Sequence, residues 1–227
     1  MLRYLSTGGP SVKKLIPPTS VSEEEVRALL DRYACPVAFH EVRARFLGSI
    51  ASPSIAMSPM KIVQGLWGGE LPEFESLDAA NELIGTLVMG LWNRLSRHQE
   101  RSAPFRLMRS ATTPNREGLA ALGLMRRQEV DGFIEGLFGS EEEAEFPVRA
   151  HRALGELGEM RAMFAAVADI AADGTKPGTS KDVETTLRLV REMTKNAEHE
   201  MHAVVLSCTR ARRQMLAGML VKKPTVH

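Results

Sequence analysis

The stretch HEVRARFLGSIASPSIAMSPMKIVQGLWGGELPEFES, residues 40–76, decides the fold that this chain is expected to adopt. Apolar residues at three- and four-residue spacing predict a helix with one buried face over residues 37–51: Phe39, Val42, Phe46 and Ile50. Ser58-Pro59 joins a helix-capping residue to the residue best tolerated at the first helical position, which predicts a second, shorter helix. Gly68-Gly69 can end that helix with positive φ angles. The stretch therefore predicts two helices separated and ended by turns, and it contains no catalytic motif.

The composition is that of an ordinary globular protein rich in helices. The 227 residues are 44% hydrophobic and 25% charged, which is enough for one large domain or two small ones with a proper core. Aromatic residues make up only 5%, whereas β-rich chains use many aromatic and β-branched residues. The formal net charge of +1 implies no global attraction to polyanions, and no apolar run is long enough to span a bilayer.

The other patterns in the first half of the chain also have the helical period. Ser22 and Glu25 form a capping box, which predicts a first helix ahead of Val26. Ser76 can cap a long helix that ends near His98, with leucines repeating along one face. No segment alternates apolar and polar residues as a strand would, so the predicted fold class is all-α.

The second half of the chain predicts three longer helices. The first covers residues 116–138 and contains four glycines, which indicate either close helix–helix approach or two shorter helices that meet near Gly123. The second begins at Pro147, and the third begins at Ser180 and meets no glycine or proline until Gly218. Unbroken, this last helix would be longer than a compact globule of this size. Either it breaks or bends around residues 194–196, which is the alternative we favour, or its C-terminal end projects.

These elements divide the chain into two helical bundles joined by a linker. The boundaries follow composition, because residues 99–115 combine prolines, threonines and scattered arginines without a helical pattern. The expected segments are an irregular N-terminal arm (1–21), an N-terminal bundle (22–98), the linker (99–115), a C-terminal bundle (116–217) and a basic tail (218–227).

Metal and catalytic chemistry find little support in the sequence. His199 and His202 are three residues apart beside Glu198, whereas the helical zinc-hydrolase motif needs histidines four apart. No third ligand can be identified, so we predict no metal, and no cofactor is implied. Cys35 and Cys208 are far apart in the sequence and are expected to be reduced thiols of a cytoplasmic protein.

Two segments are locally basic. Residues 94–127 contain eight arginines against two glutamates, and residues 209–227 contain five lysines or arginines and no acid. The candidate binding residues in or beside these segments are Arg210, Arg212, Arg213, Trp92 and Arg94. Structural roles are the alternative, because basic residues near a helix C-terminus complement its dipole and Trp92 lies beside an apolar stripe.

Several motifs resemble a known family. They are LWGGELPEFE at residues 66–75, the pair Trp92-Asn93, GFIEG at residues 132–136 and the closing RARR at residues 210–213. Together they are similar to the YecA/YgfB family, a group of uncharacterised bacterial all-helical proteins. Two departures stand out: Glu129 replaces a common tryptophan, and the cysteine-rich zinc-binding tail of many relatives is missing. The resemblance implies a pair of helical bundles and no metal role.

Three functions remain open on this sequence. The preferred one is a non-enzymatic helical protein that acts through protein–protein contacts with an unknown partner and without a membrane. The alternative is a nucleic-acid- or ribosome-associated factor that uses the arginine-rich segments, and a metal-dependent enzyme is third. The two basic segments meeting on one surface would favour the nucleic-acid alternative. The sequence sets no oligomeric state.

Overall fold

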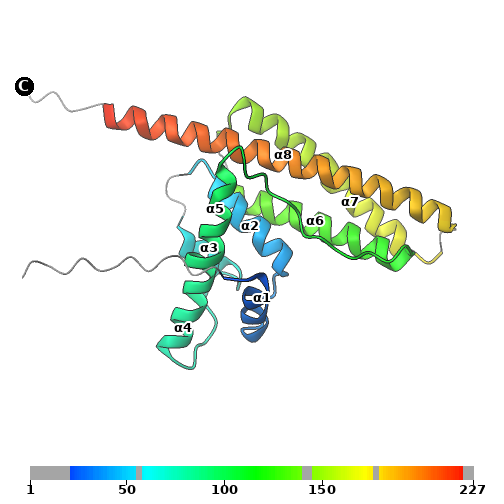
Figure 1. The fold of residues 1–227 in the computed structure, drawn as a ribbon, viewed down its shortest axis with the longest axis horizontal. Coiled ribbons are helices and arrows are strands. Elements are labelled where there is room, and N and C mark those ends of the chain that lie inside the picture. The colour runs from blue at the N-terminus through cyan, green and yellow to red at the C-terminus, as the bar shows by residue number, and fades with distance from the viewer. Residues whose placement is uncertain (1–20, 55–57, 140–144, 176–178, 222–227) are drawn as a thin grey trace, which may run out of the picture.

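The fold is all-α, as predicted. The computed structural model of the protein describes residues 21–54, 58–139, 145–175 and 179–221. About 75% of these residues are helical, and none of them is in a strand (Figure 1). Apart from Val21, the predicted N-terminal arm lies outside the described residues.

The first two helices follow their sequence signals. Helix α1 (Glu23–Arg32) starts with the predicted capping box: the Glu25 amide donates to Ser22 Oγ at 3.1 Å, and the Ser22 amide donates to Glu25 Oε2 at 2.7 Å. Helix α2 (Phe39–Ala51) buries the predicted apolar face, with Val42 and Phe46 fully inaccessible to solvent. These two helices fix the first wall of the core.

The central stretch has the predicted turns and one unpredicted feature. Helix α3 (Pro59–Gly65) is followed by Gly68 and Gly69 with φ angles of 80° and 111°. Ser76 caps α4 (Leu77–Ile84), which continues through the wider π-helical segment η1 (Gly85–Trp92), α5 (Asn93–Ser96) and the 3₁₀ turn η2 (Arg97–Gln99). The predicted long helix is therefore present, with a π-helical middle.

Side chains supply partners inside this π-helical region. Asn93 Nδ2 donates to the Met89 carbonyl oxygen at 3.1 Å, and Ser96 Oγ donates to the Trp92 carbonyl oxygen at 3.0 Å. Val21 packs on Gly90 so closely that a Cβ atom there would overlap its side chain. Because π-helical turns are rare and often lie at functional sites, this region is a candidate binding surface.

Glycines allow α6 (Arg116–Phe138) to lie almost in backbone contact with α2. A Cβ atom at Gly136 would overlap the Arg45 carbonyl oxygen, and one at Gly48 would overlap the Phe133 carbonyl oxygen. The expectation of close helix–helix approach is confirmed, and α6 runs unbroken past Gly123. The α2–α6 contact, between the predicted N-terminal and C-terminal bundles, is the most extensive among the described helices.

The last helix corrects one expectation. Helix α7 (Val148–Ala172) pairs with α8 (Ser180–Val221), which is continuous over 42 residues, so the predicted bend around residues 194–196 is wrong. Thr194 fits within the helix because its hydroxyl donates to the Val190 carbonyl oxygen at 2.7 Å and accepts from Arg126 Nε at 3.2 Å. The excess length is accommodated by projection: the C-terminal end of α8 extends beyond the other helices (Figure 1).

Truncation after Ala217 is expected to leave the melting temperature within a few degrees of wild type. Residues 213–218 are all exposed, so α8 is already free of the fold where the truncation would fall. Thermal melting followed by circular dichroism tests this. A larger drop, corresponding to more than about 1 kcal/mol in a chain of this size, would mean that the end of α8 packs on the fold.

Candidate functional site

The sequence-predicted binding residues divide into those that the fold uses and those that it leaves accessible. Arg212 belongs to the first kind, because its guanidinium donates to the carbonyl oxygens of Ile50 and Ser52, each at 3.0 Å, and to Gln99 Oε1 at 3.1 Å. Burial lowers the pKa of Arg212. This side chain ties α8 to the end of α2. Its N–H groups bond within the chain and are therefore not available to a ligand.

Trp92 and Arg94 also make contacts within the fold. The Trp92 ring packs edge-to-face on Phe46, with 5.7 Å between ring centroids. Arg94 donates to the Val21 carbonyl oxygen at 2.9 Å and lies 4.0 Å from the Glu23 carboxylate. Both residues join the N-terminal segments to the core, and neither lies in the groove described next.

Arg210 and Arg213 line an open groove of about 620 Å³ together with Arg101. Arg101 comes from the first basic segment and the other two from the second, so the structure brings the two segments together on one surface. Within the described part of the chain, no ion-pair or hydrogen-bond partner reaches any of these three guanidinium groups, and Glu100 is the acid that lines the groove. We call this surface the basic groove.

An apolar strip runs beside the basic groove on the projecting end of α8. Cys208 is fully buried, but Met215 and Leu216 further along the helix are 41% and 42% exposed. The helix thus carries its core-facing side out past the point where the rest of the fold covers it (Figure 1). Exposed apolar surface rimmed by charge is typical of contact sites between proteins.

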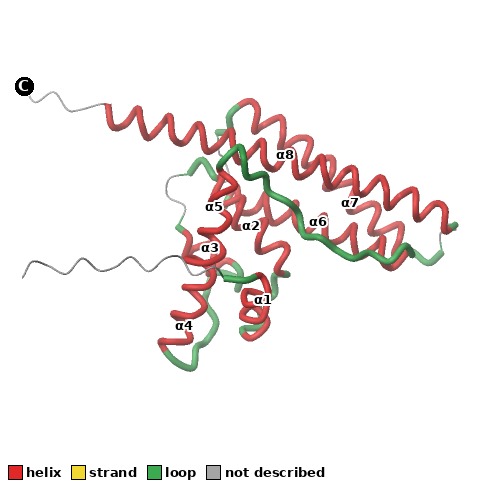
Figure 2. The backbone as a smooth tube through the Cα atoms, viewed as in Figure 1, coloured by secondary structure: helices red, strands yellow, loops and turns green. Residues whose placement is uncertain are grey.

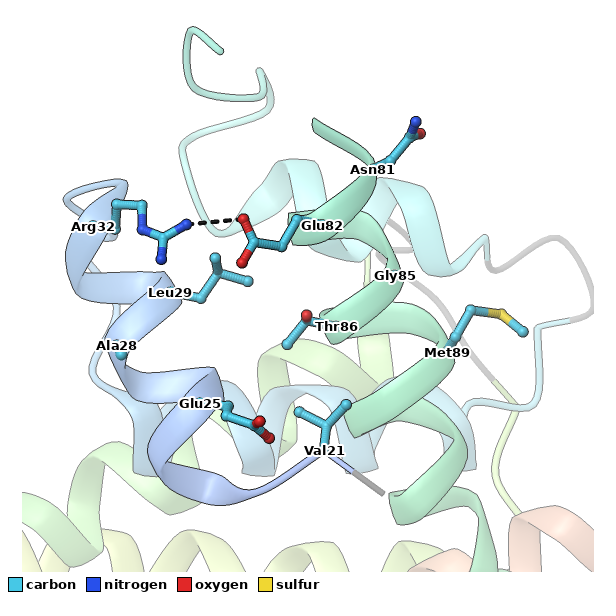
Figure 3. A pocket seen from close by; sticks show the side chains of 10 residues that line it. All are labelled: Val21, Glu25, Ala28, Leu29, Arg32, Asn81, Glu82, Gly85, Thr86 and Met89. Atoms are coloured by element: carbon cyan, nitrogen blue, oxygen red, sulfur yellow. Dashed lines mark hydrogen bonds and ion pairs between the residues drawn. The ribbon is translucent and has the colours of Figure 1, made fainter. Parts of the chain in front are cut away.

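A second groove of about 470 Å³ lies between α1 and the α4–η1 helix. Its apolar side chains include Val21, Leu29 and Met89, and Ala28 and Gly85 leave room for close approach of another backbone. Figure 3 shows the ion pair between Arg32 and Glu82, 2.8 Å apart, bridging the two helices above Leu29 and Thr86. We call this surface the α1–α4 groove.

The two rings of the histidine pair lie in different environments. The His199 side chain is 75% exposed, whereas both ring nitrogens of His202 are buried, and that burial lowers the pKa of His202. The Glu198 carboxylate instead accepts from the Leu107 amide at 3.0 Å and from Arg106 Nη1 at 2.6 Å. Among the described residues, no group of three or more potential ligands is arranged to hold a metal ion.

The linker 99–115 runs as a loop along the helices (Figure 2), and side chains of α6 and α8 hold it. Besides its contacts with Glu198, the Met108 amide donates to Glu129 Oε1 at 2.7 Å, and the Met108 carbonyl oxygen accepts from Arg126 Nη2 at 2.7 Å. Arg126 and Glu129 are both buried and form an ion pair with each other. Burial raises the pKa of Glu129, although Arg126 opposes that shift. Glu129 therefore has a structural role here.

Both cysteines are free thiols. Cys35 is half-buried, and Cys208 is buried, which raises its pKa to about 11. A thiol with so high a pKa is a poor nucleophile at neutral pH, so Cys208 packs as a small apolar residue.

Sequence signals found one surface and missed the other. Arg101 lies in a basic segment, but no sequence feature distinguishes it from the other arginines there. The fold places it in one groove with Arg210 and Arg213. No sequence motif predicts the α1–α4 groove. The one feature that could have indicated it is the run of acids without a base over residues 70–82, which includes most of α4.

Comparisons with protein-family models, with curated proteins and with solved structures found no match to this chain. The resemblance to the YecA/YgfB family therefore stays a prediction. No helix within the described ranges is both long and apolar enough to cross a membrane.

Proposed function

We propose that this is a non-enzymatic, cytoplasmic helical protein that acts by docking a partner protein on the projecting end of α8. One observation carries the proposal: α8 continues past the fold with Met215 and Leu216 exposed, and it carries Arg210 and Arg213, whose guanidinium groups have no partner among the described residues. A helix of this kind binds through its apolar side, and its charges select the partner. The expected partner surface is therefore an apolar groove with an acidic rim.

A photo-crosslinking amino acid in place of Met215 tests this proposal in native cell extract. The expected result is a discrete protein adduct that survives nuclease treatment. The matched control is the same substitution at Leu189, which is 58% exposed on the same helix but lies far from its projecting end. If Met215 gives no protein adduct, or none beyond the Leu189 pattern, the docking function is wrong.

Nucleic-acid binding is a second candidate, favoured by one specific observation: the two basic segments meet in the basic groove. The groove lining contains no aromatic side chain on which bases could stack. Contacts would therefore be to phosphates, and binding would be weak and sequence-blind.

Replacing Arg101, Arg210 and Arg213 with alanine is expected to weaken any such binding equally on two unrelated duplexes. Each lost phosphate contact should reduce the slope of log affinity against log salt by about 0.9. Filter binding at several salt concentrations measures both effects. The matched control replaces the exposed Arg152, Arg188 and Arg191, which lie elsewhere on α7 and α8. If wild type binds neither duplex at low salt, this candidate is eliminated.

A further inference from the structure

The α1–α4 groove has the shape and lining of a site for a helix. Its two walls are helices, and half of its lining is apolar or small: Val21, Ala28, Leu29, Gly85 and Met89. A Cβ atom at Gly85 would meet nothing within 4 Å, so an incoming side chain has room there. Helix-in-groove recognition uses this combination of an apolar floor and polar edges.

The edges of the groove are acidic. Its charged lining is Glu25 and Glu82 against Arg32, and the segment that leads into α4 and forms its first turns is rich in carboxylates. Residues 70–82 contain five acids and no base: Glu70, Glu73, Glu75, Asp78 and Glu82. The Arg32–Glu82 ion pair at the rim has both side chains more than half exposed, and such pairs contribute only about 0–1 kcal/mol. An incoming arginine can therefore compete for Glu82 at little cost.

The projecting end of α8 has the complementary chemistry. Residues 201–221 contain no acid, and Arg210 and Arg213 are the arginines there that line the basic groove. Met215 and Leu216 provide the apolar side, as described above. Within one chain this end and the α1–α4 groove lie well apart, on different sides of the molecule (Figure 1).

We propose that the projecting end of α8 of one copy docks in the α1–α4 groove of a second copy. The inference rests on the proposed function, since it names the partner of the same helix end. Met215 and Leu216 would lie on the groove floor near Leu29, and Arg213, which is three residues before Leu216 and therefore beside it on the helix surface, would face the acidic rim. Because the two contacting surfaces differ, the contact is heterologous, and successive copies associate head to tail unless a ring closes.

Two complementary variants test this. Gly85→Trp blocks the groove and keeps the helix end, whereas Arg210→Glu with Arg213→Glu reverses the helix end and keeps the groove. Sedimentation of wild type is expected to show an average mass that rises with concentration and falls with salt. Each variant alone should associate at least about tenfold more weakly. An equimolar mixture should form a 1:1 complex and nothing larger, since each variant supplies one intact half.

Matched controls separate these effects from misfolding. Gly158→Trp on α7 and Arg188→Glu with Arg191→Glu on α8 place the same changes at exposed positions away from both surfaces and should associate like wild type. A wild type that stays monomeric at every concentration overturns the inference, and so does a mixture without the 1:1 complex. If the purified chain is monomeric while Met215 crosslinks to a different protein in extract, the inference fails and the docking function stands.

Discussion

Gly136→Ala is expected to destabilise the protein by about 3 kcal/mol and to lower its melting temperature by roughly 6–12 °C. The added Cβ atom would overlap the carbonyl oxygen of Arg45 and lie 2.8 Å from its carbonyl carbon. These atoms are backbone in the middle of α2, so they cannot rotate away as a side chain would. The two helices must separate, and the α2–α6 contact is the most extensive among the helices that the structure describes.

The control for this substitution is Gly155→Ala on α7. Gly155 is also helical and exposed, but its Cβ position meets nothing within 4 Å. Alanine there should stabilise the protein by up to about 1 kcal/mol, because glycine is the poorer helix former. Thermal melting of both variants gives opposite signs. A Gly136→Ala variant that melts like wild type would show that α2 and α6 do not approach this closely.

Local features of the fold could be predicted because their physics is local. The capping box of Ser22 and Glu25 involves atoms three residues apart, and the positive φ angles of Gly68 and Gly69 are a property of glycine itself. The glycines of α6 also signalled a close approach correctly. The sequence could not say that α2 is the helix approached, since that contact joins residues about ninety positions apart.

The continuity of α8 was mispredicted for a different reason. Thr194 and Asn196 are weak helix formers, and an unbroken helix of this length is longer than a compact globule of this size. In the fold, Arg126 of α6 donates a hydrogen bond to the Thr194 hydroxyl, and the C-terminal end of α8 extends beyond the other helices. Both facts depend on tertiary contacts or on their absence, and neither has a signature in the local sequence.

The candidate site shows the same limit. Charge counting found the two basic segments, but it could not rank the arginines within them. Arg212 is held by the carbonyl oxygens of Ile50 and Ser52, while Arg101 is accessible beside Arg210 and Arg213. Arg212 lies on the side of α8 that contacts the end of α2, whereas Arg210 and Arg213 line a groove with Arg101 of the linker. The sequence shows which residues are charged, but it does not show which groups each charge contacts in the fold.

Glu129→Leu is expected to be the most damaging single substitution, with a loss of about 3–5 kcal/mol. Its carboxylate is fully buried, pairs with the buried Arg126 and accepts from the Met108 amide. Leucine has a similar size, so the loss would come from charge and hydrogen bonding: Arg126 would keep a buried charge without its counter-ion. The melting temperature should fall by roughly 6–20 °C, measured by calorimetry or circular dichroism.

The double variant Arg126→Met with Glu129→Leu is expected to regain part of that loss. Burial raises the pKa of Glu129, which reflects the cost of keeping its carboxylate ionised, so removing both charges removes that cost as well. Recovery should stay incomplete, because the amide and carbonyl groups of Met108 lose their partners in the double variant. The control is Glu192→Leu, which breaks the exposed ion pair with Lys195 at the same three-residue spacing and should cost less than about 1 kcal/mol. If Glu129→Leu costs no more than this control, the buried pair does not hold the linker to α6.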